Sequence, residues 1–102
     1  MTPADVRFRR SPATPWRRVG DEVILAPPGR VDFDVLTGTG PFVWELLTVP
    51  STIPELTSAL AELCAAAEKD IASDVEHLVA SLLERDAVQA VEGGQQDHAV
   101  VR

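Results

Sequence analysis

The apolar residues of this 102-residue chain change their spacing once, near Thr37, and this change constrains the fold class. Before it, the segment Val31-Asp-Phe-Asp-Val35 alternates apolar and charged residues, which is the period of a strand with one buried face. After it, apolar residues recur every three or four positions, as on one face of an α-helix. We therefore expect an α+β fold, in which a three-stranded antiparallel sheet is followed by three helices.

Turn-forming residues divide the first part of the chain into strands. Gly20-Asp21 is a tight-turn pair, and neither a helix nor a central strand tolerates the Pro-Pro-Gly run that ends at Gly29. The three expected strands are residues 16–19, 22–26 and 31–35. Two shorter strands are expected near residues 6–9 and 87–91.

The third of these strands is expected to have one buried and one exposed face. Its apolar residues are expected to point into the core: Val31, Phe33 and Val35. Asp32 and Asp34 are then expected to point outward. These carboxylates either protect an edge strand from aggregation or take part in the choice of a partner.

Three helices are expected in the second part of the chain. The first begins at Pro41, stops before Pro50 and has an apolar face with Trp44 at its side: Phe42, Val43, Leu46 and Leu47. The second opens with the capping box Thr52-Ile-Pro-Glu55 and runs to about residue 66 with this stripe: Ile53, Leu56, Leu60 and Leu63. The third spans about residues 69–85 with a wider stripe: Ile71, Val75, Leu78, Val79, Leu82 and Leu83.

Residues 16–91 are expected to form one domain. Residues 1–15 contain three prolines and no period, which predicts a flexible arm, and residues 92–102 are expected to be a disordered tail. No apolar run has the length of a signal peptide or of a membrane span. The single cysteine, Cys64, excludes an internal disulfide and fits a reducing compartment. These features predict a cytoplasmic protein without a membrane partner.

The net charge of −7 arises in the second half of the chain. Residues 1–50 carry six basic and six acidic side chains, whereas residues 51–102 carry three basic and ten acidic ones. Such a surface repels a phosphate backbone, so the helical half is poorly suited to reading nucleic acid.

The sequence does not contain the residue pattern of any catalytic site that we considered. The two histidines are His77, among carboxylates on the third expected helix, and His98, in the expected tail. No cysteine or second histidine completes a metal site around His77. The loop Gly38-Thr-Gly40 lacks the length and the lysine of a phosphate-binding loop. We therefore expect no enzymatic activity, no metal ion and no cofactor.

Six segments follow one another along the chain in a distinctive order: Val23-Ile-Leu-Ala-Pro-Pro-Gly29, Leu36-Thr-Gly-Thr39, Val43-Trp-Glu-Leu-Leu47, Thr52-Ile-Pro-Glu-Leu56, Ile71-Ala-Ser-Asp-Val75 and Leu82-Leu-Glu-Arg-Asp-Ala-Val88. Together they resemble the PqqD-like family, the peptide chaperones of pyrroloquinoline quinone biosynthesis and their relatives. The resemblance spans about residues 16–91. Thr37 stands where the family pattern Leu-Asn-x-Thr has asparagine, and Asp86-Ala87 stands where a glycine turn is usual.

The resemblance implies a non-catalytic chaperone that is similar to a winged helix-turn-helix and does not bind DNA. Such proteins capture the leader region of a ribosomally synthesised precursor peptide as an added strand. They present it to a modifying enzyme such as a radical enzyme, a protease or a cyclase. We expect the leader to lie between the strand at residues 31–36 and the third helix. The expected peptide-binding residues are Val31, Asp32, Phe33, Asp34, Val35, Leu36, Asp74, Leu78, Ser81 and Arg85.

Two alternatives remain beside this hypothesis. The order of elements is also that of a DNA-binding winged-helix transcriptional regulator, but residues 51–86 carry two basic and eight acidic side chains, where a groove-reading helix should be basic. The other alternative is a structural helical dimer, which self-association without peptide binding would reveal. A homodimer is left open by the sequence.

Overall fold

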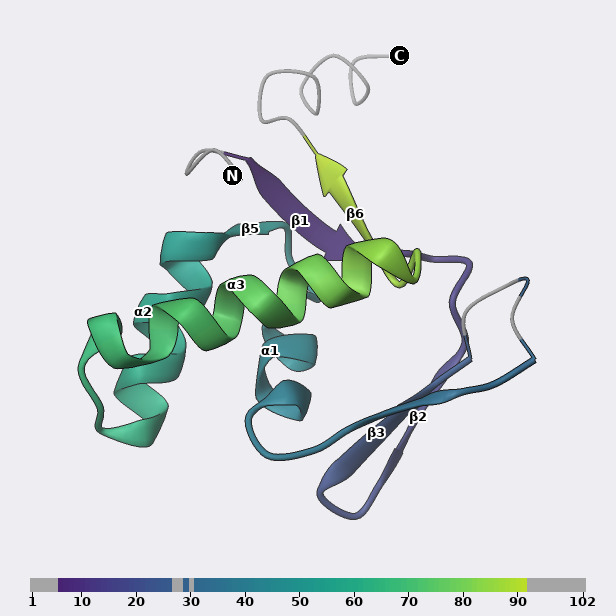
Figure 1. The fold of residues 1–102 in the computed structure, drawn as a ribbon, viewed down its shortest axis with the longest axis horizontal. Helices are drawn as coiled ribbons and strands as arrows, with labels where there is room; N and C mark the ends of the chain where they lie inside the picture. The colour runs from purple at the N-terminus through teal and green to yellow at the C-terminus, as the bar shows by residue number, and fades with distance from the viewer. Residues whose placement is uncertain (1–5, 27–28, 30, 92–102) are drawn as a thin grey trace.

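The computed structural model describes residues 6–26, 29 and 31–91, which form two three-stranded antiparallel sheets and three helices (Figure 1). One sheet has the order β2 (Trp16–Val19), β3 (Glu22–Leu25), β4 (Asp34–Leu36). In the other, β1 (Arg7–Arg10) lies between β5 (Ser51–Thr52) and β6 (Val88–Val91). The helices are α1 (Gly40–Leu46), α2 (Ile53–Cys64) and α3 (Glu68–Glu84). The expected α+β class, with a three-stranded antiparallel sheet and three helices, is confirmed; the resemblance to a winged helix-turn-helix stays a prediction.

The second sheet joins the two ends of the described chain. β1 is its central strand, and Phe8 within it is 1% exposed. The N–H of Ser11 also donates to the carbonyl oxygen of Ala87 at 2.8 Å. The short strands expected near residues 6–9 and 87–91 are confirmed as β1 and β6, so regular structure begins before Trp16, inside the stretch expected to be an arm. Residues 1–5 and the expected tail at 92–102 lie outside the described residues.

The expected orientation of the third strand of the main sheet is wrong. β4 begins at Asp34, and cross-strand partners place Leu36 opposite Val23 and Asp34 opposite Leu25. Val23 and Leu25 are fully buried, and partners in a pair share a face, so Asp34 and Leu36 point inward. The residues expected to point inward are instead exposed by 99% at Val31, 64% at Phe33 and 48% at Val35. A shift of one residue in register exchanges the two faces of a strand. The expected strand and the observed one differ by such an exchange: the residues expected to point inward point outward, and Asp34 points inward.

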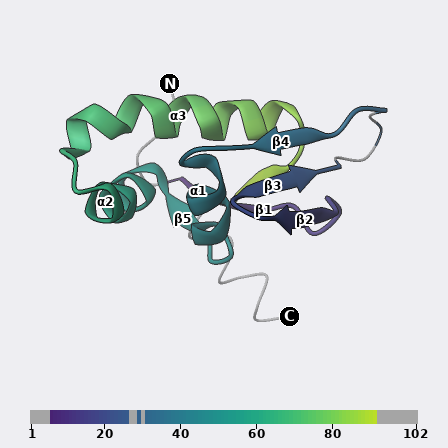
Figure 2. The same ribbon diagram turned by 90° about the horizontal axis from the view of Figure 1, so that it is seen from below.

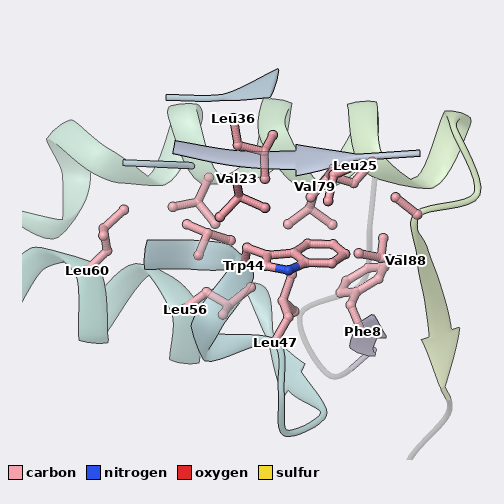
Figure 3. Close-up of a cluster of buried hydrophobic side chains, with 14 of the residues drawn as sticks. Phe8, Val23, Leu25, Leu36, Trp44, Leu47, Leu56, Leu60, Val79 and Val88 are labelled. Atoms are coloured by element: carbon pink, nitrogen blue, oxygen red, sulfur yellow. The ribbon is translucent and has the colours of Figure 1, made fainter. Parts of the chain in front are cut away.

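The core gathers around Trp44, which α1 places at the centre of the molecule. Figure 3 shows its ring between Val23 and Leu25 on one side and Leu47 and Leu56 on the other. Trp44 is fully buried rather than at the side of the helix, and Phe42, which was expected to belong to the apolar face, is exposed. A seven-residue helix buries only a narrow stripe, and in α1 Val43 and Trp44 occupy it.

The second and third helices follow the sequence pattern closely. The Thr52 side chain accepts from the N–H of Glu55, and the Glu55 side chain accepts from the N–H of Thr52, so the capping box is confirmed. The helix ends at Cys64, and Ala65 has a left-handed φ of 52°. Leu63, in the last turn, is exposed instead of continuing the apolar stripe. The buried residues of α3 are Ile71, Val75, Val79 and Leu82.

Candidate peptide-binding groove

β4 is an edge strand of its sheet. Among the described residues it pairs with β3 on one side only, so its other edge offers unpaired N–H and C=O groups at strand spacing. α3 runs beside this strand (Figure 2). The sequence folds this way locally because Leu36 anchors the strand in the core, while the left-handed Gly38, with a φ of 61°, turns the chain into α1.

Two pockets lie between β4 and α3, and Leu78 lines both of them. The larger, of about 230 Å³, reaches down to the start of α1 and is lined by Val35, Leu36, Thr37, Thr39, Gly40, Val43, Leu60, Asp74, Val75 and Leu78. The smaller, of about 140 Å³, is lined by Asp34, Val35, Leu36, Leu78, Ser81, Leu82 and Arg85. A strand along β4 would therefore pass two hollows separated by one leucine.

The position of Leu78 on α3 gives both pockets an apolar wall. Val75, Val79 and Leu82 are almost completely buried, whereas Leu78 is half-buried and packs against the core from its edge. The expected stripe on this helix is wider than its contact with the core. Its margin faces the groove.

One ion pair spans the groove at its smaller pocket. Arg85 donates through Nη1 to Oδ1 of Asp34 and through Nε to Oγ of Ser81, the second bond at 3.3 Å. The Asp34 side chain is 19% exposed and that of Arg85 is 40% exposed. The other carboxylate oxygen, Oδ2, is buried and has no hydrogen-bond partner among the described residues. This oxygen is a buried acceptor beside the hollow.

The structure brings together seven of the ten residues that the sequence predicted for the site. They line one or both pockets: Asp34, Val35, Leu36, Asp74, Leu78, Ser81 and Arg85. Val31, Asp32 and Phe33 precede β4 and line neither pocket. The expectation that Asp34 points away from the core is corrected here, because its carboxylate is turned to α3 by Arg85.

The sequence reasoning missed the far wall of the larger pocket. Thr37, Thr39 and Gly40 come from the loop that follows β4 and from the first turn of α1. A Cβ added at Gly40 would lie 3.1 Å from Cβ of Leu36, which is closer than ordinary contact, so glycine allows the loop to close against the strand. The direct succession of edge strand and glycine loop was the available signal.

The groups that line the groove determine what it can contact. Within ranges 6–26, 29 and 31–91, no three His, Cys, Asp or Glu side chains come together to hold a metal ion. None of the helices described here has the length and apolarity to cross a bilayer. What the groove offers is a free strand edge, two partly apolar hollows and one paired carboxylate.

Comparison with known families gives this groove a context. The family model described as Coenzyme PQQ synthesis protein D (PqqD) matches residues 22–88, which include β3, β4 and all three helices. The chain belongs to the PqqD family. At the level of the family, membership supports the role of a peptide-binding chaperone in coenzyme PQQ synthesis. In that role the protein is a non-catalytic accessory to the synthesis. Membership gives no support to the DNA-binding alternative. No match was found among curated proteins or among solved structures.

Proposed function

We propose that this protein binds the leader region of a ribosomally synthesised precursor peptide by strand addition to β4 and presents the peptide to a modifying enzyme. The observation that carries this proposal is the free edge of β4 beside the two pockets. Backbone hydrogen bonds to an edge strand give affinity without regard to sequence, and the pockets for side chains give selectivity.

An extended peptide along β4 would pass both pockets. Alternate side chains of a strand point to the same face about 7 Å apart, and we expect two of them to enter the hollows on either side of Leu78. The larger hollow has an apolar floor of Val43, Leu60 and Val75. We therefore expect the leader to place an apolar side chain there.

The charge of α3 favours a leader that carries basic residues. The helix has five acidic residues and one lysine: Glu68, Asp70, Asp74, Glu76, Glu84 and Lys69. Asp74 is exposed and lines the larger pocket. An acidic surface steers a basic peptide toward the groove, and it repels DNA.

Leu78→Ala tests the apolar contact. The titrant is the precursor peptide encoded beside the gene, and calorimetry measures its affinity. We expect Leu78→Ala to weaken binding by ~1–3 kcal/mol, the usual effect of truncating a buried anchor. Leu63→Ala, a truncation of an exposed leucine on α2, is the matched control and should bind like the wild type. Equal affinity of the wild type, Leu78→Ala and Leu63→Ala would show that Leu78 does not belong to the binding site.

Amide hydrogen exchange tests strand addition itself. Bound peptide should slow exchange at the amides of β4 that face its free edge, because those N–H groups gain an acceptor. Amides of β2, on the opposite edge of the sheet, serve as the internal control. Protection confined to α3 or β2 would contradict binding by strand addition on β4.

A further inference from the structure

A further pocket lies between α2 and α3, apart from the groove. Its volume is about 310 Å³, and none of its residues lines either pocket of the groove. The two helices that form it pack against each other (Figure 1), so both of its walls are held by the core. α2 contributes Ile53, Pro54 and Thr57 to the lining, and α3 contributes Glu68, Lys69, Ala72 and Glu76.

Helical spacing places this pocket and the groove on different sides of α3. Glu68, Ala72 and Glu76 recur every four residues, so they lie along one flank of the buried stripe of the helix. Asp74 and Ser81, which line the groove, lie on the opposite flank of the same stripe. A peptide bound along β4 therefore leaves this pocket open to a second partner.

The floor of the pocket contains a hydroxyl group without a partner. Thr57 is 4% exposed, and its Oγ1 atom is buried and makes no hydrogen bond with the part of the chain that the structure describes. Buried polar atoms of proteins are nearly always hydrogen-bonded, so such an atom marks a place where a ligand can supply the missing partner. Ile53, Pro54 and Ala72 add apolar surface to the lining. The pocket thus combines apolar walls with one unused acceptor.

Charged side chains form the exposed rim of the pocket: Glu68, Lys69 and Glu76. The ion pairs found within residues 6–26, 29 and 31–91 include none of these three. Two carboxylates outweigh one ammonium group, in a chain of net charge −7, so the rim attracts a cation. An arginine side chain has an apolar stem and a charged head. Its several N–H groups can donate to a hydroxyl and to a carboxylate at the same time.

We propose that this pocket receives an arginine side chain of the modifying enzyme. The stem of the arginine lies on the apolar lining, and its guanidinium donates to Oγ1 of Thr57 and pairs with the carboxylates of the rim. This inference rests on the proposed function, because the enzyme is the partner to which the peptide is presented. A leader extended along β4 occupies the other flank of α3, which leaves this flank to the enzyme. Leader and enzyme can then bind one domain together.

Titration with n-butylguanidinium, an arginine head on an alkyl stem, tests the pocket without enzyme or leader. Amide NMR signals of Thr57 and Ala72 should shift and saturate, whereas sodium chloride at equal ionic strength should not produce these shifts. Glu76→Gln should weaken the probe about two- to fivefold, as expected for an exposed ion pair. Glu84→Gln removes the same charge from an exposed position of α3 that lines none of these pockets, and should bind like the wild type. Shifts that do not saturate, or equal weakening by both variants, overturn the proposal.

Thr57→Val separates recognition from structure. Valine keeps the shape of threonine and removes a hydroxyl that has no partner, so the free protein should be at least as stable as the wild type in urea unfolding. The same variant should bind n-butylguanidinium about three- to tenfold more weakly, because the guanidinium loses one acceptor. Unchanged affinity for the probe in the folded variant would overturn the assignment of Oγ1 to the site.

The modifying enzyme encoded beside the gene identifies the source of the arginine. Calorimetry should show that Thr57→Val binds this enzyme about three- to tenfold more weakly than the wild type does, and binds the leader peptide with unchanged affinity. Leu78→Ala should lose affinity for the leader, which is a separate readout of the proposed function. Enzyme affinity that Thr57→Val leaves unchanged overturns this inference, even where the leader binds along β4 as proposed.

Discussion

At the scale of single residues, Asp34 and Arg85 form an unequal pair. The arginine side chain is 40% exposed and keeps much of its contact with water, whereas the aspartate is 19% exposed and has one buried oxygen without a partner. Removing the aspartate leaves a cation that water can solvate. Removing the arginine leaves a largely buried carboxylate without its charged partner, which costs free energy of folding.

We therefore expect Arg85→Ala to destabilise the protein more than Asp34→Ala. The loss for Arg85→Ala should be about 1–3 kcal/mol, the cost of an unsatisfied buried acceptor, and the loss for Asp34→Ala should be less than half of that. Urea unfolding followed by circular dichroism measures both. Equal losses would mean that the pair contributes through its mutual attraction alone, without a penalty for the buried oxygen.

At the scale of elements, the N-terminus of α2 connects both parts of the fold. Oε1 of Glu55 accepts from the N–H of Thr52 at 2.9 Å and from Nη1 of Arg7 on β1 at 2.9 Å. The backbone hydrogen bond from Thr52 lowers the pKa of Glu55 below its ordinary value of 4.5; Arg7 adds to this effect and partial burial opposes it. Because the folded protein holds this carboxylate ionised at lower pH than the unfolded chain does, the contact stabilises the fold above pH 4.5.

Glu55→Gln should reveal this contribution. The amide keeps an oxygen acceptor for the cap and loses the charge, so at neutral pH the variant should be less stable than the wild type by under about 1 kcal/mol, as expected for an exposed pair. The difference should vanish as the pH falls through the lowered pKa of Glu55. Thr52→Ala, which removes the side-chain acceptor for the N–H of Glu55, should still cost about 1 kcal/mol below that pKa. Urea unfolding at several pH values distinguishes the two; a constant difference for Glu55→Gln would contradict the linkage.

The sequence predicted those elements that local patterns determine. The capping box marked the start of α2, and Gly20-Asp21 marked the turn between β2 and β3, because both signals depend only on neighbouring residues. β5 was missed because a two-residue strand exists only through its pairing with β1, more than forty positions away. The orientation of β4 was wrong for a related reason. The alternation of apolar and charged residues along this strand allows either set to face the core. Only the register with β3 decides which set does.

The candidate site was predictable to the extent that it lies on one helix. The residues of α3 recur at helical spacing, so Asp74, Leu78, Ser81 and Arg85 could be assigned to one margin. The loop wall at Thr37 and Thr39 depends on how the chain folds back from β4, which periodicity does not describe. The departure at Asp86 proved compatible with the family pattern: its φ of 62° is the left-handed conformation that a glycine turn requires, and aspartate tolerates it better than most residues.

At the scale of the whole molecule, a single core connects the two sheets. Phe8 of β1 and Val88 of β6 belong to the same buried cluster as Val23 of β3 and Trp44 of α1. Arg10, at the end of β1, also places its guanidinium over the rings of Trp16 and Trp44, with Cζ at 4.9 and 5.3 Å from their centroids. The strand expected to be part of an arm is therefore integral to the domain that carries the groove.

Phe8→Ala should destabilise the entire domain and not only its first strand. A buried phenylalanine truncated to alanine costs about 3–5 kcal/mol, which is a large share of the 5–15 kcal/mol of a typical domain. We expect one cooperative unfolding transition at markedly lower temperature, detected equally by far-ultraviolet circular dichroism and by the fluorescence of the buried Trp44. Arg9→Ala, at the exposed neighbouring position of the same strand, is the control and should unfold like the wild type. Loss of β1 without a change in the Trp44 signal would show that the two sheets unfold independently, against the single core.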